Sequence, residues 1–425
     1  MKFLISLAWK NLSRYRKRTV ITAVALAFGI SLFIFMDSML IGVETESERN
    51  LILYETGSAR IMHEAYWEKR DQLPVTHTIE NPAAVEERLK GMKIPAAPRT
   101  VFGGELIVDR DPFPEDGSMQ VRVFAIDPEK DDTVFGFRQT VVEGRYLLPD
   151  ENGILLGGWL AEDLGAKIGY PVRIVTRTRY GQHQVMDLEV VGIVSCPNPL
   201  INRGSIFMPL ATADYYMEME GAVTEINLRF PENLSVRSDG EKEAEQKALA
   251  VQKDLAADFT SLEVLPWPVL GKDALAIARA KQSGSSVILL LIFIIAAVGV
   301  SNTMLMAIFE RTRELGMMRA LGMKNSQIRL AFLLEAGGIG FIGSAAGVVL
   351  GFFLTFLIVR RGIDFSWLLR DMDIGYRISG LMHGAWNPGT MIEAFFIGIV
   401  MAAVIAFFPT RRALKMRITD CLRDT

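Results

Sequence analysis

Residues 20–41 read VITAVALAFGISLFIFMDSMLI, an apolar run with Asp37 as its one charged residue. A helix of about 20 apolar residues crosses hydrocarbon about 30 Å thick, so this run is long enough to span a bilayer. It follows a basic stretch, as the core of a signal peptide does. It is too long for such a core and lacks a small-residue cleavage site, so we expect an uncleaved anchor. The four predicted transmembrane helices are residues 20–42, 286–309, 328–359 and 390–409.

The distribution of lysine and arginine predicts how these helices are inserted. Basic residues gather in three short segments beside the apolar runs, 1–19, 310–327 and 410–425. Segment 360–389, between the third and fourth runs, has only Arg360, Arg361, Arg370 and Arg377, far fewer than the three segments together. Because lysine and arginine accumulate on the cytoplasmic side, we expect both termini in the cytoplasm and residues 43–285 outside it. The pattern predicts a multi-pass protein of the cytoplasmic (inner) membrane.

The composition argues against several classes of function. The chain is 50% hydrophobic and its basic tracts adjoin apolar runs, which indicates contact with a lipid bilayer and no nucleic-acid partner. Its histidines are scattered singly, so we predict no metal site. Cys196 and Cys421 fall on opposite sides of the membrane in this topology and cannot pair within one chain. No Ser/His/Asp or paired-carboxylate constellation indicates a membrane-bound enzyme, so we predict no catalytic residue.

The long segment 43–285 mixes strand and helix patterns. Stretches such as MQVRVFAID and DLEVVGIV have the composition and alternation of strands, whereas NPAAVEERLK has a helical pattern. We predict an α/β part formed by residues 58–127 and 223–267, divided by a β-rich insert at 133–212. The residues next to the first two spans favour helices that continue outward as a stalk, with a hinge at Gly284 as the alternative. The predicted fold class is an α-helical membrane protein with four transmembrane helices and an extracytoplasmic α+β domain.

The third predicted span carries small residues on one side. Gly343, Gly347 and Gly351 recur at a four-residue spacing, which lets another helix approach closely. The same span contains a literal G-x-G-x-x-G at 338–343, but a dinucleotide-binding loop needs a preceding strand and the start of a helix. We therefore assign these glycines to helix packing. We assign Asn302, in the second span, to packing between helices as well, through an interhelical hydrogen bond.

Residues 310–336 read ERTRELGMMRALGMKNSQIRLAFLLEA and lie in the predicted cytoplasmic loop before the third span. The first half predicts a helix in which Glu310 and Arg313 are spaced i,i+3, with Gly322 as its stop and Ser326 as the cap of the next helix. Its apolar stripe is Leu315, Met318 and Leu321. A short helix that is apolar on one side and cationic on the other either fills a groove on a partner protein or lies on anionic lipid.

This loop resembles the second cytoplasmic loop of MacB/LolC/LolE/FtsX-type ABC transporter permeases, which reads close to ERTREIGxxRALGA with a following LLEA. The matching residues are Glu310, Arg311, Thr312, Arg313, Glu314, Gly316, Arg319, Ala320, Leu321, Gly322, Leu333, Leu334, Glu335 and Ala336. The opening LAWKNLSRYRKRT and the segment 141–174 also resemble the family. The closing PTRRALKMRITDCLR resembles its final segment but lacks the usual proline. The resemblance spans nearly the whole chain.

The resemblance implies that the loop contains the coupling helix, which docks on a cytoplasmic ABC ATPase. The residues then expected at the ATPase interface are Glu310, Arg311, Arg313, Glu314, Leu315, Met318, Arg319, Leu321 and Gly322. The sequence has no G-x-x-x-x-G-K-[ST] motif, so we expect that this chain binds no cofactor and is no enzyme, and that a separate ATPase binds ATP and Mg²⁺. Two ATPases and a second permease subunit, identical or paralogous, are implied.

The layout resembles the lipoprotein-releasing LolC and LolE permeases. That resemblance implies a permease that transmits ATP-driven motion to a porter-like outer domain with a β-rich insert, for lipoprotein release or trafficking. A lipoprotein cargo or a periplasmic partner would then bind the outer domain. Two alternatives stay open: MacB-like export of a small molecule or peptide, and FtsX-like regulation of peptidoglycan hydrolases.

Overall fold

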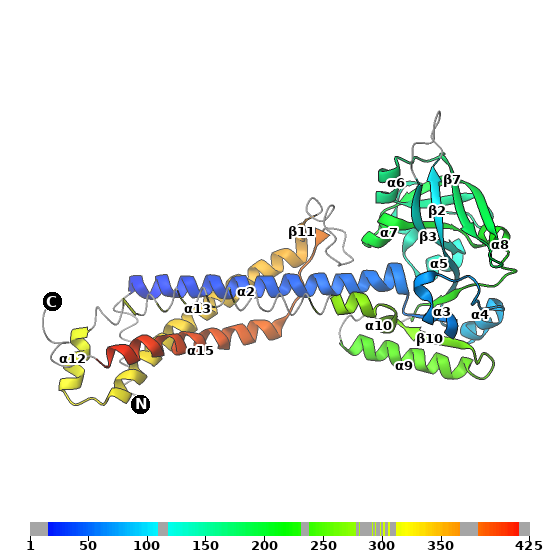
Figure 1. Cartoon of the computed structure of the whole chain (residues 1–425). Coiled ribbons are helices and arrows are strands. Elements are labelled where there is room, and N and C mark those ends of the chain that lie inside the picture. The colour runs from blue at the N-terminus through cyan, green and yellow to red at the C-terminus, as the bar shows by residue number, and fades with distance from the viewer. Residues whose placement is uncertain are drawn as a thin grey trace. The chain divides into compact units, whose positions relative to one another are not determined.

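The computed structural model describes residues 16–108, 118–230, 238–277, 312–365 and 381–415, with single positions between 280 and 306. The chain divides into two compact units. We call the first, residues 1–43, 279–364 and 381–425, the membrane unit. We call the second, residues 44–278 and 365–380, the sheet domain. Each is described by itself below (Figure 1).

The membrane unit contains long apolar helices. Within the described ranges, three helices are long and apolar enough to cross a membrane. They are α2 (Arg16–Leu51), α13 (Asn325–Arg361) and α15 (Pro388–Ala413), and they contain the predicted spans 20–42, 328–359 and 390–409. The predicted span 286–309 and Asn302 lie outside the described residues, apart from isolated helical positions. The number of four spans therefore remains a prediction.

The three helices pack through small and aliphatic side chains. Their shared core is formed by Ala23, Leu26, Ile30, Ile34, Ala336, Ile339, Ala394, Ala402 and Ala406. Asn387, the N-cap of α15, donates from Nδ2 to Asp37 Oδ2 of α2 at 3.1 Å. Large apolar side chains such as Val349 and Phe353 point outward and are exposed, as expected for helices whose surroundings are hydrocarbon.

The helix α2 does not end where its apolar run ends. It continues to Leu51 and is followed directly by a π-helical turn, η1 (Ile52–Thr56), before Gly57 stops it. Residues 272–277, which precede the second predicted span, are also helical. The outward helical continuation that the sequence predicts is therefore present after the first span. For the second it can be followed only to residue 277.

The sheet domain is built on one ten-stranded sheet with the order β10-β1-β9-β2-β3-β8-β5-β7-β4, in which β6 pairs with β2 and β7. The strands are β1 (Ala59–His63), β2 (Ala96–Val108), β3 (Ser118–Ile126), β4 (Val141–Gly144), β5 (Gly153–Gly157), β6 (Pro171–Arg177), β7 (His183–Val194), β8 (Ser205–Pro209), β9 (Glu225–Leu228) and β10 (Leu262–Pro266). The first strand thus lies between the last two, antiparallel to both.

Helices cover this sheet. They are α3 (Glu64–Glu68), α4 (Pro82–Gly91), α5 (Pro128–Val134), α6 (Gly158–Leu164), α7 (Pro199–Gly204), α8 (Leu210–Met217), α9 (Ser238–Leu255) and α10 (Trp267–Leu270), with the 3-10 turns η2 (Arg70–Gln72) and η3 (Phe137–Thr140). In the membrane unit, two short strands, β11 (Ile363–Asp364) and β12 (Leu381–Met382), pair with each other.

The hydrophobic core of the sheet domain has separate centres. One contains Ile61, Val85, Ile226 and Val251, from β1, α4, β9 and α9. Another is formed by side chains of β2, β3 and β5 to β8, and includes Leu106, Val123 and Ile174. Strands β2 and β3 lie in the predicted α/β part but pack in the second core with strands of the predicted β-rich insert. The two predicted parts therefore share this core within one continuous sheet. Their exact boundaries remain a prediction.

Candidate functional site

The loop helix that carries the sequence motif is α12 (Thr312–Ala320). It ends in a Schellman motif, because the amide of Met323 donates to Met318 O at 3.1 Å and that of Gly322 donates to Arg319 O at 3.1 Å. Gly322 has φ +90°, a left-handed conformation that glycine adopts at little cost. Glycine therefore ends the helix here, as the sequence predicts. Glu310 and Arg311 lie outside the described residues.

The cap of the following helix differs from the prediction. Ser326 was the predicted cap of the third span, but α13 begins one residue before it, at Asn325. The side chain of Gln327 accepts a hydrogen bond from the amide of Lys324 at 3.0 Å. A glutamine at the third helical position can reach back to the N-cap amide, so Gln327 takes the role that had been assigned to Ser326.

The inner side of α12 packs on the membrane unit. Met318 contacts a cluster formed by Ile328 of α13 with Ala413 and Leu414 at the end of α15. Gly316 is buried as well. Packed interiors leave little free volume, and α12 packs in this way against α13 and the end of α15.

The outer side of α12 presents a separate stripe. Arg313 and Met317 of α12 and Leu321, the residue directly after it, are all exposed. They follow one another at a four-residue spacing, and the amide of Leu321 still donates to Met317 O at 2.9 Å, so the three lie on one face. The exposed fraction is 86% for Leu321 and 47% for Met317. We call these three residues the docking face. The predicted stripe of Leu315, Met318 and Leu321 is therefore divided: Met318 lies half-buried against the core, Leu321 points outward, and the side chain of Leu315 lies outside the described residues.

Sequence reasoning missed Met317. The signal that could have identified it is the i, i+4, i+8 series from Arg313 to Leu321. The remaining predicted interface residues, Glu314 and Arg319, are half-buried. Both take part in polar or electrostatic contacts within the chain. Arg313 likewise has a contact of this kind within the chain.

The glycine stripe of α13 faces α2. A Cβ added at Gly343 would lie 3.0 Å from the carbonyl oxygen of Ala23, and one at Gly347 would lie 2.8 Å from that of Ala27. At Gly351 it would lie 3.0 Å from Cβ of Ile34. Such distances leave no room for a side chain, so the two helices approach closely because these residues are glycines. The stripe thereby holds α13, the helix that follows α12, against α2, the helix that continues into η1.

Two family models match the chain. A MacB-like periplasmic core domain matches residues 19–248, more than half of the sequence, and an FtsX-like permease C-terminal domain matches residues 286–418. The chain belongs to the MacB/FtsX-type ABC transporter permeases. In this permease the first matched region contains most of α2 and most of the sheet domain, and the second contains α12, α13 and α15.

Curated relatives support the same assignment for the permease. An ABC transporter permease of Methanocaldococcus jannaschii is 23% identical over 425 residues, covering 99% of this chain and 97% of its own. The lipoprotein-releasing system transmembrane protein LolC of Neisseria meningitidis is 24% identical over 71% of this chain and 73% of its own. The macrolide export ATP-binding/permease protein MacB of Escherichia coli is 25% identical over 53% of this chain, which corresponds to 32% of MacB.

Proposed function

We propose that this permease transmits the motion of a separate cytoplasmic ABC ATPase to its sheet domain. The observation that carries the proposal is the docking face of Arg313, Met317 and Leu321, exposed on a short helix whose opposite side is packed into the membrane unit. Burying an exposed leucine or methionine side chain at an interface contributes about 1.5–3 kcal/mol. A cationic residue beside two apolar ones is suited to a groove with an acidic rim.

The path of the motion follows from the packing. The inner side of α12 contacts α13 and the end of α15, so a displaced ATPase would shift these helices. The glycine stripe then couples α13 to α2 without intervening side chains. Because α2 is helical without interruption from Arg16 to Leu51, a shift or tilt of its membrane part is carried along its length.

The orientation is part of the proposal. Both termini and α12 are on the cytoplasmic side, and the sheet domain is outside the cytoplasm. The match of residues 19–248 to a MacB-like periplasmic core domain supports this orientation. The accumulation of basic residues in segments 310–327 and 410–425 supports it independently. Two permease subunits, identical or paralogous, would assemble with two ATPases that bind ATP and Mg²⁺, in line with relatives whose names join an ATP-binding part to a permease.

We infer lipoprotein release or trafficking as the process that this motion drives. The match to LolC extends over 71% of this chain, into both the sheet domain and the membrane unit. A second candidate is MacB-like export of a small molecule or peptide, which the MacB-like match of residues 19–248 favours. Proteoliposomes that carry a lipidated protein separate the two, since ATP-dependent release of that protein supports the first and ATP-dependent efflux of a trapped solute supports the second.

Charge reversal on α12 tests the ATPase assignment. The variant Arg313→Glu with Arg319→Glu should reduce the amount of ATPase that co-purifies with the permease at least ten-fold and uncouple its activity. Arg177→Glu, at an exposed position of the sheet domain, is the matched control and should leave the yield of ATPase unchanged. Undiminished association of the ATPase with the doubly reversed permease would contradict the proposal.

A further inference from the structure

The end of α2 has an unusual local structure. The α-helix changes into the π-helical turn η1 over Ile52–Thr56, and the chain then turns at Gly57 with φ +65°. A Cβ at this position would lie 2.9 Å from the carbonyl oxygen of Leu228, so glycine is required there for space as well as for conformation. Single π-helical turns are rare and are frequently found at functional sites.

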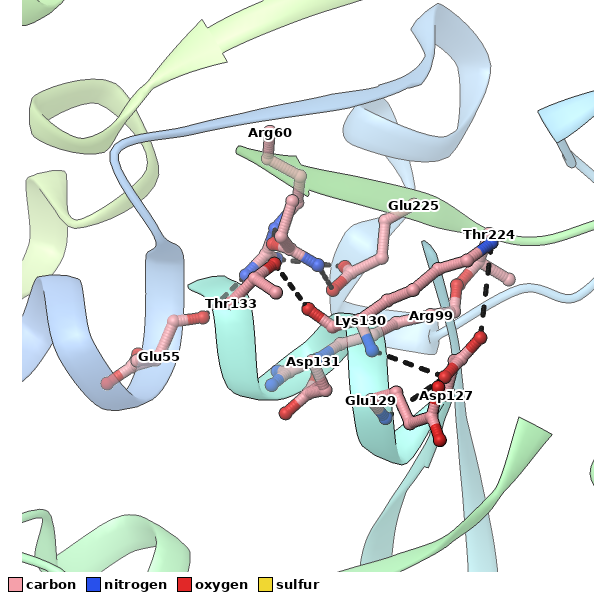
Figure 2. Close-up of polar contacts among 11 residues, drawn as sticks. Glu55, Arg60, Arg99, Asp127, Glu129, Lys130, Asp131, Thr133, Thr224 and Glu225 are labelled. Carbon is pink, nitrogen blue, oxygen red and sulfur yellow. Dashed lines mark hydrogen bonds and ion pairs between the residues drawn. The ribbon is translucent and has the colours of Figure 1, made fainter. Parts of the chain in front are cut away.

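Glu55, within this turn, is hydrogen-bonded through its backbone to a residue of β1. Its carbonyl oxygen accepts a hydrogen bond from Arg60 Nη2 at 2.6 Å. The same guanidinium forms an ion pair with Glu225 of β9 at 3.0 Å and donates from Nε to Asn227 at 2.7 Å. Figure 2 shows Arg60 lying between Glu55 and Glu225. The backbone of the turn is thus connected to the neighbouring strands β1 and β9.

The side chain of Glu55 is bound on another side by the segment before α7. Its Oε2 accepts a hydrogen bond from Asn198 Nδ2 at 3.0 Å. Asn198 is completely buried and is also the N-cap of α7, where its Oδ1 accepts from the amide of Leu200 at 3.1 Å. The neighbouring Tyr54 adds an edge-to-face contact with Phe137 of η3 at a centroid distance of 5.6 Å.

A cavity lies beside the turn. It has a volume of about 160 Å³ and is lined by Glu55 and Thr56 together with Arg60, Tyr66 and Glu225 among others. The cavity is partly open to the surface, and side chains do not fill the space beside the turn. It gives the turn room to shift while its two hydrogen-bonded connections are kept.

We propose that η1 is the joint through which α2 moves two separate parts of the sheet domain, with Glu55 as the positioning residue. The backbone carbonyl of Glu55 is hydrogen-bonded to Arg60 and is thereby connected to β1 and β9. The carboxylate of Glu55 is hydrogen-bonded to Asn198 and is thereby connected to α7. Asn198 is buried, and a buried donor that loses its acceptor is destabilising, because no water replaces the lost hydrogen bond. It therefore follows the carboxylate when the turn moves. This role rests on the proposed function, because it presumes that ATP-driven motion reaches α2.

Spin-label distances test the role of Glu55 in the complete complex of permease and co-purifying ATPase. One label is attached at Leu200→Cys on α7 and the other at Leu249→Cys on α9, both of which are exposed positions. Cys421→Ser removes one native thiol, and the buried Cys196 is kept. The distance distribution is recorded without nucleotide and with ATP trapped by vanadate, and the rate of ATP hydrolysis is measured on the same samples.

In the otherwise unsubstituted chain, trapped ATP should shift the α7 to α9 distance. In Glu55→Ala that shift should fall at least two-fold while the rate of hydrolysis stays within two-fold. Glu55→Asp, whose shorter side chain draws the carboxylate away from Asn198, should behave in the same way and serves if the alanine variant folds poorly. Glu55→Gln keeps an acceptor oxygen and should retain the shift. Glu80→Ala, which removes a carboxylate bound to Arg179 and Thr78 elsewhere in the domain, is the matched control and should also retain it.

Two different failures can be told apart. A full shift in both Glu55→Ala and Glu55→Asp would overturn the role of Glu55 and leave the proposed function standing. Absence of any shift in the otherwise unsubstituted chain, under conditions in which ATP is hydrolysed, would overturn the proposed transmission itself and the role of Glu55 with it.

Discussion

Gly347 of α13 lies so close to α2 that a Cβ on it would be 2.8 Å from the carbonyl oxygen of Ala27. Contacts of this kind are not compatible with a side chain unless one helix moves away. The close approach of α13 and α2 therefore depends on the absence of a single carbon atom. It is also the step in the proposed path at which motion of the cytoplasmic loop would reach the helix that leads out of the membrane.

Substitution of Gly347 should separate these helices. Gly347→Val should destabilise the permease by about 1–3 kcal/mol, the usual cost of an overpacked interior, and lower its thermal midpoint in detergent. Gly337→Ala, in the same helix at a position with no atom within 4 Å of an added Cβ, is the control and should leave the midpoint unchanged or slightly raised. Equal midpoints for the two variants would contradict the packing described for the stripe.

The buried ion pair of the sheet domain gives a second prediction. Arg99 and Asp131 are labelled in Figure 2; Arg99 Nε lies 2.7 Å from Asp131 Oδ1, and the two side chains are 1% and 0% exposed. The guanidinium carbon of Arg99 lies 3.5 Å from the ring centre of Phe135. Asp131→Ala would leave a buried charge without its partner, which costs about 3–5 kcal/mol. The thermal midpoint should fall by on the order of 10 °C.

The control for this pair is an ion pair at the surface. Glu243→Ala breaks an i,i+4 pair with Lys247 on α9 and should cost about 0.5 kcal/mol or less. The double variant Arg99→Met with Asp131→Leu removes both charges and should recover most of the midpoint that Asp131→Ala loses. If it recovers none, the loss in Asp131→Ala does not come from an uncompensated charge.

Cys196 should be chemically inert in the folded protein. The side chain is 4% exposed, and burial raises the pKa of its thiol to about 12. Because an unfolded cysteine ionises near about pH 8.5, the stability that this thiol contributes below that pH is lost as the pH rises toward 12. Maleimide should modify Cys196 only after unfolding, and Cys196→Ala should lessen the alkaline loss of stability. Rapid labelling at pH 7 without unfolding would contradict its burial.

The membrane orientation can be tested with the other cysteine. In intact spheroplasts, an impermeant maleimide should modify a cysteine introduced at Tyr215, which is exposed on α8 of the sheet domain. It should modify Cys421, in the predicted cytoplasmic tail, only after the membrane has been made permeable. Modification of Cys421 in intact spheroplasts would show that the carboxyl terminus lies outside.

Hydropathy and charge predicted the features that depend on local composition. The apolar runs within α2, α13 and α15 and the stop at Gly322 are of this kind, because membrane insertion and helix termination are decided by short stretches of chain. Features that depend on contacts between distant residues could not be predicted in this way. The position of β1 between β9 and β10 is one example. The hydrogen bond between Glu55 and Asn198 is another, since it joins residues that are 143 positions apart.

Within the candidate site, the sequence indicated which residue types α12 contains, but not which of its faces packs against the rest of the protein. A helix with apolar residues on several sides offers more than one possible inner face, and packing decides between them. From the sequence, Met318 was grouped with Leu315 and Leu321 in one apolar stripe at the expected ATPase interface. Its packing against Ile328 leaves Met317 on the outer face with Leu321. The cap formed by Gln327 could have been found from its position three residues after Lys324.

Photocrosslinking from the docking face tests the central claim most directly. A benzoylphenylalanine at position 321, in the complete permease in native membranes, should form a covalent adduct with the ABC ATPase, and the same residue at position 215 of the sheet domain should not. The yield at position 321 should fall at least ten-fold when Arg313→Glu and Arg319→Glu are present. An adduct with lipid alone from position 321, in membranes that contain the assembled ATPase, would contradict the account, because α12 would then lie on the bilayer surface.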